Sequence, residues 1–177
     1  YRRQRQMCIR DRQYIDMMLQ YLRLEGLGTD YVLEEYPVKA MVNQAVKYFA
    51  RIFISKGIAV HIDIPEEMKV VTDEKWMVFV LKQLISNALK YTKQGRIDIS
   101  MGEDRVLIIE DTGIGIAPED LPRIFERGYT GYNGRKDKKA TGLGLFLVKR
   151  ILKQLQHQIV IESELNVGTR VSIHLGK

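Results

Sequence analysis

The sequence predicts an α+β fold: a two-layer α/β sandwich with a mixed, mostly antiparallel sheet and its helices on one face. Two observations support this prediction. Apolar residues recur with helical spacing in four segments and alternate with polar residues in the segments between them. In the second half of the chain the alternating segments form adjacent pairs joined by short turns. Such pairs make antiparallel hairpins, and the helices between them return to one face.

Two helices and a strand are predicted first. An apolar stripe that starts near Tyr14 and stops before Gly26 predicts a helix at 13–27, which we interpret as the end of a longer amphipathic helix. Pro37, at a favoured first-turn position, and Gly57, at a C-cap position, bound a second helix at 37–56. Alternating apolar residues then predict a half-buried strand at 58–64.

The remaining elements alternate helices with pairs of strands. Asp73 is a suitable N-cap for a third helix that runs to about Tyr91. The other predicted elements are strands 96–101 and 105–110 around a turn at 102–104, a long helix at 143–156, and strands 159–163 and 169–175.

Composition excludes several classes of protein. The chain has 177 residues, 45% of them hydrophobic, which is enough for one domain with a hydrophobic core. The single cysteine, Cys8, excludes an internal disulfide framework. No apolar run approaches the roughly 18 residues that span a bilayer, so we expect a cytoplasmic domain, of a kind that membrane proteins also contain.

The net charge of +6 is concentrated at one end of the chain. The first twelve residues hold five arginines and one aspartate, and the remainder is nearly balanced. A charge excess confined to one terminus is poor evidence for nucleic-acid binding, so we expect no nucleic-acid partner. We interpret residues 1–12 as a disordered or non-native leader.

About thirty residues between Glu110 and Leu143 lack a regular pattern, and connections of that length are usually functional or disordered. They begin with the sequence DTGIGIAP, which contains Asp111, Gly113 and Gly115. The glycines allow a sharp turn and the close approach of a flat ligand, and the carboxylate suits the exocyclic amine of a purine. An ordinary Asx-Gly turn is the alternative interpretation.

A second glycine motif, 141–145 with the sequence TGLGL, opens the last predicted helix. Free backbone N–H groups and the positive end of the helix dipole make such a start suitable for phosphate. The motif is neither a Walker loop nor a Rossmann fingerprint. Glycines that serve close packing alone are the alternative.

One face of the third predicted helix is polar, because Gln83, Asn87, Lys90 and Tyr91 lie at positions i, i+4, i+7 and i+8. The amide oxygen of Asn87 is a suitable ligand for a Mg²⁺ ion that nucleotide phosphates also hold. Lys90 suits a phosphate, and Tyr91 suits the nucleotide. A merely solvated face is the alternative.

A basic stretch in the long connection predicts a lid over a polyphosphate, with a solvated loop as the alternative. Its cations are Arg127, Arg135, Lys136, Lys138 and Lys139.

In this order the motifs resemble a known family. The segments "LISNALKYT", "EDTGIGI", "RIFERGYTG" and "ATGLGLFLVKRI" are similar to the N, G1, F and G2 boxes of the ATP-binding domain of sensor histidine kinases, which has the Bergerat fold. The resemblance covers about 32–176. It implies ATP and Mg²⁺ as cofactors, and a protein histidine kinase as the enzyme.

The resemblance also implies roles for individual residues. Asn87 would hold Mg²⁺, and Asp111 would bind the adenine amine. The glycines would shape the adenine pocket (Gly113, Gly115) and flank the phosphates (Gly142, Gly144). Further nucleotide contacts would come from Lys90, Tyr91, Ile116, Thr141, Leu143, Leu145 and Thr169, the last in the closing "VGTRVSIHL". Gln83, Asn87, Lys90 and Arg127 would serve catalysis.

Two departures from the family pattern matter. The motif around the phosphoacceptor histidine is absent, and we expect His61, His157 and His174 to be structural or surface residues. Hydrolytic relatives of the same fold carry Glu four residues before the Asn, where this chain has Gln83. Because a neutral amide cannot take a proton from water, phosphoryl transfer is favoured over hydrolysis.

The resemblance implies a domain order and a set of partners. The segment 13–27, which contains "YIDMMLQYLRLE", would end a dimerisation helix, and 28–177 would be the catalytic domain. The partners would be the protein's own phosphoacceptor domain and a response regulator, with a homodimeric parent in the plasma membrane. The motifs are most similar to kinases that sense antimicrobial peptides beside an ABC transporter. An ATPase of the same superfamily and a degenerate nucleotide-binding interaction module are the alternatives.

Overall fold

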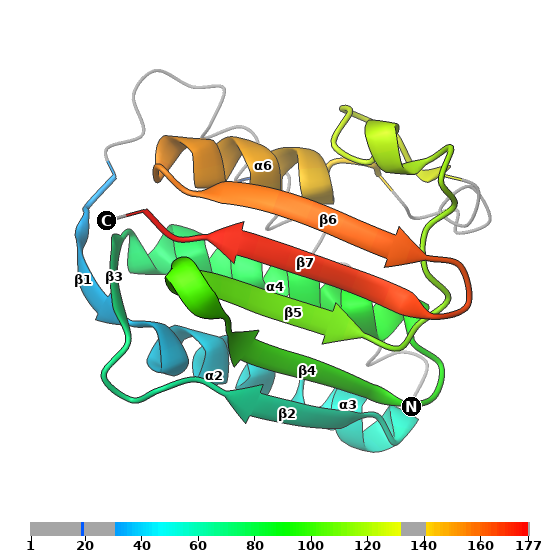
Figure 1. Cartoon of the computed structure of the whole chain (residues 1–177), viewed down its shortest axis with the longest axis horizontal. Helices are drawn as coiled ribbons and strands as arrows, with labels where there is room; N and C mark the ends of the chain where they lie inside the picture. The colour runs from blue at the N-terminus through cyan, green and yellow to red at the C-terminus, as the bar shows by residue number, and fades with distance from the viewer. Residues whose placement is uncertain (1–18, 20–30, 132–140, 177) are drawn as a thin grey trace. The chain divides into compact units, whose positions relative to one another are not determined.

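A computed structural model describes residue 19, residues 31–131 and residues 141–176 (Figure 1). The chain divides into two compact units, Tyr1–Tyr31 and Val32–Lys177, and the second contains the elements discussed below. The predicted leader and the helix at 13–27 lie outside the described residues, except for Leu19, which is helical.

The second unit is built on a five-stranded sheet. Its strands lie in the order β2 (Ala59–Asp63), β4 (Arg96–Met101), β5 (Val106–Asp111), β7 (Gly168–His174) and β6 (Gln158–Glu164). Only the β2–β4 pair is parallel among these neighbours, and the other three pairs are antiparallel. This confirms the predicted mixed, mostly antiparallel sheet.

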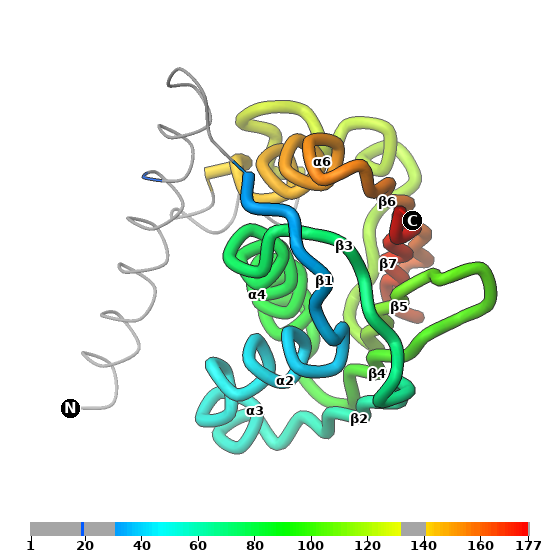
Figure 2. The backbone as a smooth tube through the Cα atoms, turned by 90° about the vertical axis from the view of Figure 1, so that its left-hand side faces the viewer, coloured from blue at the N-terminus to red at the C-terminus, as the bar shows by residue number. Residues whose placement is uncertain are grey.

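Within the described residues, one face of the sheet is covered by the helices α2 (Val38–Tyr48), α3 (Ala50–Lys56), α4 (Glu74–Tyr91) and α6 (Gly144–Gln154), as Figures 1 and 2 show. Helix α4 is the central one, since it packs against α2, α6 and β5. Its apolar stripe, which includes Leu81, Leu84 and Ile85, is buried together with Ile99 and Ile109 of the sheet. The predicted two-layer fold is therefore confirmed.

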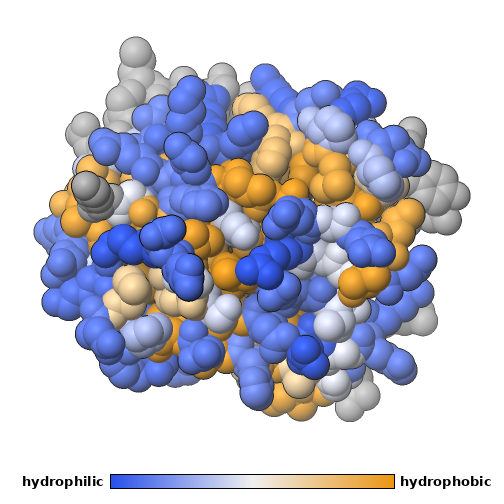
Figure 3. Space-filling model, in the orientation of Figure 1, coloured by the Kyte–Doolittle hydropathy of each residue, from blue (hydrophilic) through white to orange (hydrophobic). Residues whose placement is uncertain are grey.

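The other face of the sheet carries polar and charged side chains, with apolar patches between them (Figure 3). On this face Arg96 pairs with Asp98 at 2.7 Å, and Arg170 pairs with Glu110 at 3.4 Å. The alternation of the strands thus separates an apolar inner face from a largely polar outer one.

The predicted single helix at 37–56 is wrong. It breaks at Phe49, where φ is −100° and ψ is 7°, so that α2 ends and α3 begins there. The side chain of Phe49 is fully buried, and its N–H donates to the carbonyl of Val46, three residues back. Such a tight last turn leaves the helical path, and it directs the aromatic ring into the core.

Two short strands were absent from the prediction. β1 (Glu34–Pro37) and β3 (Lys69–Thr72) pair antiparallel and form a separate two-stranded sheet. The short 3₁₀ segments are η1 (Glu103–Arg105), in the predicted turn between β4 and β5, and η2 (Leu121–Arg123), in the long connection.

Candidate functional site

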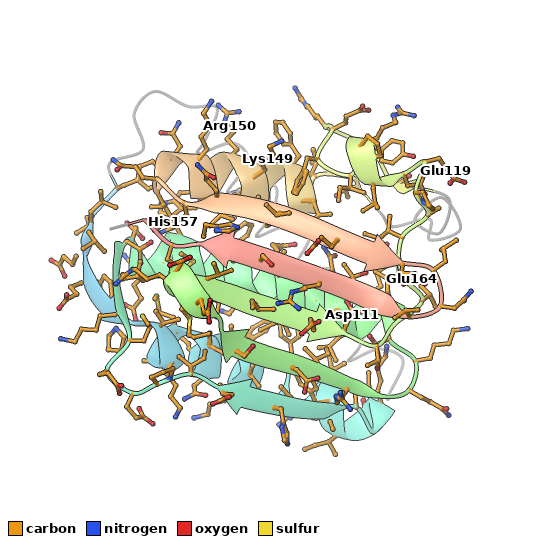
Figure 4. All side chains as sticks on the ribbon, in the orientation of Figure 1. Asp111, Glu119, Lys149, Arg150, His157 and Glu164 are labelled. Atoms are coloured by element: carbon orange, nitrogen blue, oxygen red, sulfur yellow. The ribbon has the colours of Figure 1, made fainter. Side chains whose placement is uncertain are left out.

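The predicted adenine acceptor, Asp111, is the last residue of β5 (Figure 4). It shares the parity of Leu107 and Ile109, so its side chain faces the helical layer. Its carboxylate accepts hydrogen bonds from the backbone N–H of Gly113, at 2.8 Å, and from that of Thr169 on β7. Burial raises the pKa of Asp111, and these hydrogen bonds offset part of that effect. The site therefore holds a half-buried acceptor in a fixed orientation.

The C-terminus of α4 meets the segment that follows Asp111. The N–H of Ile114 donates to the carbonyl of Tyr91 at 3.1 Å. A Cβ atom at Gly113 would lie 2.7 Å from both Asp111 Oδ1 and the Tyr91 carbonyl oxygen. Only glycine fits here, so α4 and β5 are held in close contact at the predicted adenine pocket.

Residues 113–118, here called the glycine loop, also pack against the turn between β6 and β7. Gly115 has φ +70°, and a Cβ there would lie 2.1 Å from the carbonyl oxygen of Glu164. The N–H of Ile116 donates to Ser163 Oγ at 2.8 Å, and the N–H of Asn166 donates to the carbonyl of Ile114 at 2.9 Å. The structure thus brings together the predicted adenine-side residues Tyr91, Asp111, Gly113, Gly115, Ile116 and Thr169.

The predicted phosphate side lies at the start of α6. Gly142 has φ +65°, and a Cβ there would lie 2.3 Å from the backbone of Gly128, whose N–H donates to the Gly142 carbonyl at 3.0 Å. Thr141 Oγ1 accepts from the N–H of Leu143, which is the N-cap residue of α6. Among the described residues no side chain caps this helix, and its first turn has no acidic residue. Its first N–H groups are therefore suited to an anion.

Three residues of the α4 polar face lie near this helix start or near the adenine side. A Cβ at Gly144 would lie 3.2 Å from Gln83 Oε1, which places the Gln83 amide against the first residue of α6. Asn87 is one turn further along α4 and half-buried. Lys90 is exposed, with its ammonium 5.0 Å from the centre of the Tyr91 ring. The predicted binding face therefore runs between the two ends of the site.

Two further predicted site residues are described by their position in the chain and by their exposure. Leu145 is half-buried in the first turn of α6, and Arg127 is exposed in the long connection. The other predicted lid cations, Arg135, Lys136, Lys138 and Lys139, lie outside the described residues.

Two positioning contacts were not predicted from the sequence. Ser163 bonds to the glycine loop, and Lys56 Nζ donates to the carbonyls of Leu89 and Thr92 at the end of α4. A sequence signal exists for Ser163, because it is a polar residue at the inward-facing parity of Ile159 and Ile161. No local pattern indicates that Lys56, on a different helix, reaches α4.

The three histidines are placed as expected. His157 is buried, accepts from the N–H of Gly176 through Nδ1 at 2.9 Å, and lies 3.2 Å from Thr72 Oγ1 through Nε2. His61 and His174 are exposed on strands. The described part of the chain contains neither a cluster of three potential metal-ligating side chains nor a helix long and apolar enough to cross a membrane.

A half-buried carboxylate beside a glycine loop lies at one end of the polar face of α4, and the start of α6 lies at the other. This arrangement suits a nucleotide, with its base at one end and its phosphates at the other. The chain belongs to the family described as "Histidine kinase-, DNA gyrase B-, and HSP90-like ATPase", whose model matches residues 72–177. The predicted family is therefore confirmed, and the chain contains an ATP-binding catalytic domain of the histidine kinase type.

Similar proteins include two sensor kinases and one solved structure. "Sensor protein kinase GraS" of Staphylococcus aureus (strain MRSA252) is 36% identical, over 90% of this chain and 47% of its own length. "Sensor protein BceS" of Bacillus subtilis (strain 168) is 34% identical, over 88% of this chain and 47% of its own length. Full-length ShkA in complex with AMPPNP has a TM-score of 0.75 and 22% identity, over 90% of this chain and 34% of that one. The chain thus spans about half the length of the curated relatives it matches.

Proposed function

We propose that the chain binds MgATP and transfers the γ-phosphoryl group to a histidine on the dimerisation domain of its full-length protein, from which a response regulator receives it. One observation carries this proposal: Asp111 and the glycine loop lie at one end of the polar face of α4, and the start of α6, which no described side chain caps, lies at the other.

The adenine end provides the base specificity. The carboxylate of Asp111 accepts hydrogen bonds, so it suits the exocyclic amine of adenine. The carbonyl oxygen that guanine carries at this position would meet the carboxylate acceptor to acceptor. Gly113 allows the end of α4 to pack closely against Asp111, because a Cβ atom there would clash with both the Asp111 carboxylate and the Tyr91 carbonyl.

The phosphate end provides charge stabilisation. The N–H groups at the start of α6 face the phosphates, and Lys90 and Arg127 add positive charge. Asn87 fits a magnesium ion, since its amide oxygen is a neutral, hard ligand on the half-buried polar face of α4. A magnesium ion held there beside the phosphates would balance part of their charge. The chain's own contribution is therefore to position the phosphates and to balance their charge.

Gln83 favours transfer over hydrolysis. Its side-chain oxygen lies beside Gly144, at the start of the helix that would face the phosphates. An amide there has no basic site that would accept a proton from water, so water is not activated at this position. An imidazole needs no such base, because it is already a nucleophile when neutral.

We further propose that the parent protein is a homodimeric, membrane-anchored sensor kinase of the peptide-sensing type that works beside an ABC transporter. The similarity to the sensor kinases GraS and BceS supports the sensor kinase part. The likeness of the motifs at 73–92 and 128–151 to that subgroup supports the remainder.

Labelled ATP tests the proposed function. The chain is incubated with γ-labelled MgATP, alone and with a separately purified phosphoacceptor domain of GraS. We expect acid-labile label on the added domain only, and none when its acceptor histidine is replaced by alanine. Three results would contradict the proposal: label on this chain that is lost on mutating one of its histidines, steady hydrolysis without an acceptor, or no binding of MgATP.

A further inference from the structure

We propose that Ser163 is a positioning residue that makes the Thr169 hydroxyl a hydrogen-bond acceptor on the adenine side of the site. This inference rests on the proposed function. Ser163 lies near the end of β6, half-buried, and on the inward-facing parity of that strand. Its Oγ is within hydrogen-bond distance of three groups: the N–H of Ile116 at 2.8 Å, the carbonyl of Gly168 at 2.8 Å, and Thr169 Oγ1 at 2.9 Å.

The chemistry of these three groups fixes the direction of each bond. A hydroxyl has one proton to donate and two lone pairs to accept with. The N–H of Ile116 only donates, and the carbonyl of Gly168 only accepts, so the Ser163 proton points to Gly168. The Thr169 hydroxyl must then donate its proton to Ser163. Ser163 thereby uses its whole hydrogen-bonding capacity, and Thr169 Oγ1 has only lone pairs left for a ligand.

Thr169 lies beside the predicted adenine acceptor. It is the register partner of Asp111 across β5 and β7, and its backbone N–H donates to the Asp111 carboxylate. With its proton committed to Ser163, Thr169 adds a second acceptor next to that carboxylate. Two neighbouring acceptors match a base that carries an amine, and they disfavour a base that carries a carbonyl oxygen there.

The same hydroxyl also holds the glycine loop in place. Ile116 is tied to Ser163, Ile114 accepts from Asn166, and Gly115 packs directly against the Glu164 carbonyl. Ser163 therefore joins three parts of the adenine side: the loop, the end of β6 and the start of β7. If the Ser163 hydroxyl is removed, the Thr169 hydroxyl is no longer held by it, so it can rotate and donate its proton to a ligand.

The test compares MgATP with inosine triphosphate, in which a carbonyl oxygen replaces the amine. We expect Ser163→Ala to lower ATP affinity about tenfold by calorimetry, and to lower the preference for ATP over inosine triphosphate by a similar factor. Ser163→Thr, which keeps the hydroxyl, restores both. Ser100→Ala, on the outer face of β4, is the matched control and changes neither.

Thr169→Val supplies a second route to the same result if Ser163→Ala does not fold. It removes the hydroxyl that Ser163 orients, and it should lower the same preference. An unchanged ATP preference in either folded variant would overturn the inference, even if the affinities for both nucleotides fell equally. Failure of the wild-type chain to bind MgATP would instead contradict the proposed function, so the two failures are distinguishable.

Discussion

Asp111 is half-buried, although burial of a carboxylate costs free energy. Burial raises its pKa, which means that the folded state disfavours the charged form relative to the unfolded state. A group with a raised pKa contributes its stability at low pH, and this contribution is lost as the pH rises through the folded-state pKa. An ionised Asp111 therefore works against folding, which fits the role that we propose for it as an acceptor for the adenine amine.

This balance predicts opposite effects of one substitution on binding and on stability. Asp111→Asn should weaken ATP binding by about 1.5–3 kcal/mol, because a charged hydrogen bond to the adenine amine is lost. Its free energy of unfolding at pH 7 should be unchanged or higher, since the buried charge is removed. Calorimetry and urea unfolding measure the two effects. A marked loss of stability with unchanged ATP affinity would assign Asp111 a structural role.

Asn87 has a different expected signature, because its proposed partner is the metal. Asn87→Ala should leave the melting temperature of the free chain within a few degrees. It should abolish the gain in ATP affinity that magnesium provides. Titrations with ATP in the presence of Mg²⁺ and of a chelator measure that gain. Asn43→Ala, an exposed asparagine on α2, is the matched control. A magnesium effect of wild-type size in Asn87→Ala would remove Asn87 from the metal site.

At the scale of elements, the site depends on how α4 is held at both ends. At its start, Asp73 is the N-cap and accepts from the N–H of Trp76 at 3.1 Å, as predicted. At its end, the ammonium group of Lys56 donates hydrogen bonds to the carbonyl of Leu89 and, at 3.2 Å, to the carbonyl of Thr92. A cation at a helix C-terminus satisfies free carbonyls and interacts favourably with the helix dipole. Because α4 carries Gln83, Asn87 and Tyr91, both ends determine where these residues lie.

Removing the contact between Lys56 and the C-terminal end of α4 should therefore lower the free energy of unfolding more than removing a surface ion pair does. Lys56→Met should lower the free energy of unfolding by about 1 kcal/mol. Lys69→Met, which breaks an exposed pair with Glu35, should lower it by less than about 0.5 kcal/mol. Urea unfolding compares the two variants. Equal losses would show that Lys56 is an ordinary surface lysine.

The elements that the sequence predicts well are those with local signals. Helix α4 has an N-cap and a long apolar stripe, and β4 and β5 flank a short turn, so their bounds are within a residue or two of the prediction. The break at Phe49 depends on burying one ring, which no helical periodicity reveals. β1 and β3 are four residues long and about 35 residues apart, so their pairing is a tertiary effect.

The candidate site shows the same division between local and tertiary signals. Asp111 and the glycines are recognisable because their motifs are contiguous, and the structure brings the adenine-side residues together. Ser163 and Lys56 act through hydrogen bonds across 47 and 36 residues of sequence. Only the fold reveals such contacts.

At the scale of the whole molecule, His157 joins distant parts of the catalytic unit. It follows α6, and it contacts Thr72 at the end of β3 and Gly176 near the C-terminus. The Gly176 N–H donates to Nδ1, so the neutral ring carries its proton on Nε2 and donates it to Thr72. Burial, with a smaller contribution from Arg105, lowers the pKa of His157 from 6.5 to about 4.

A lowered pKa makes stability depend on pH. As the pH falls, the unfolded chain takes up a proton at His157 before the folded chain does. The stability from this residue is fully present above about pH 6.5 and is lost towards pH 4, by at most about 3 kcal/mol. His157→Gln should remove this part of the slope in urea unfolding between pH 7 and pH 4. The exposed His174 is the control, and His174→Gln should keep the slope. A slope unchanged in His157→Gln would contradict the assignment.

We propose that the molecule holds an adenine nucleotide between Asp111 and the start of α6. Calorimetric titration of the whole chain with MgATP and with MgGTP tests this proposal. We expect a single site that binds MgATP at least about tenfold more tightly than MgGTP, because guanine would present an acceptor to the Asp111 carboxylate. We also expect Asp111→Asn to reduce this preference. Equal affinity for the two nucleotides, or a preference that survives in Asp111→Asn, would contradict the account.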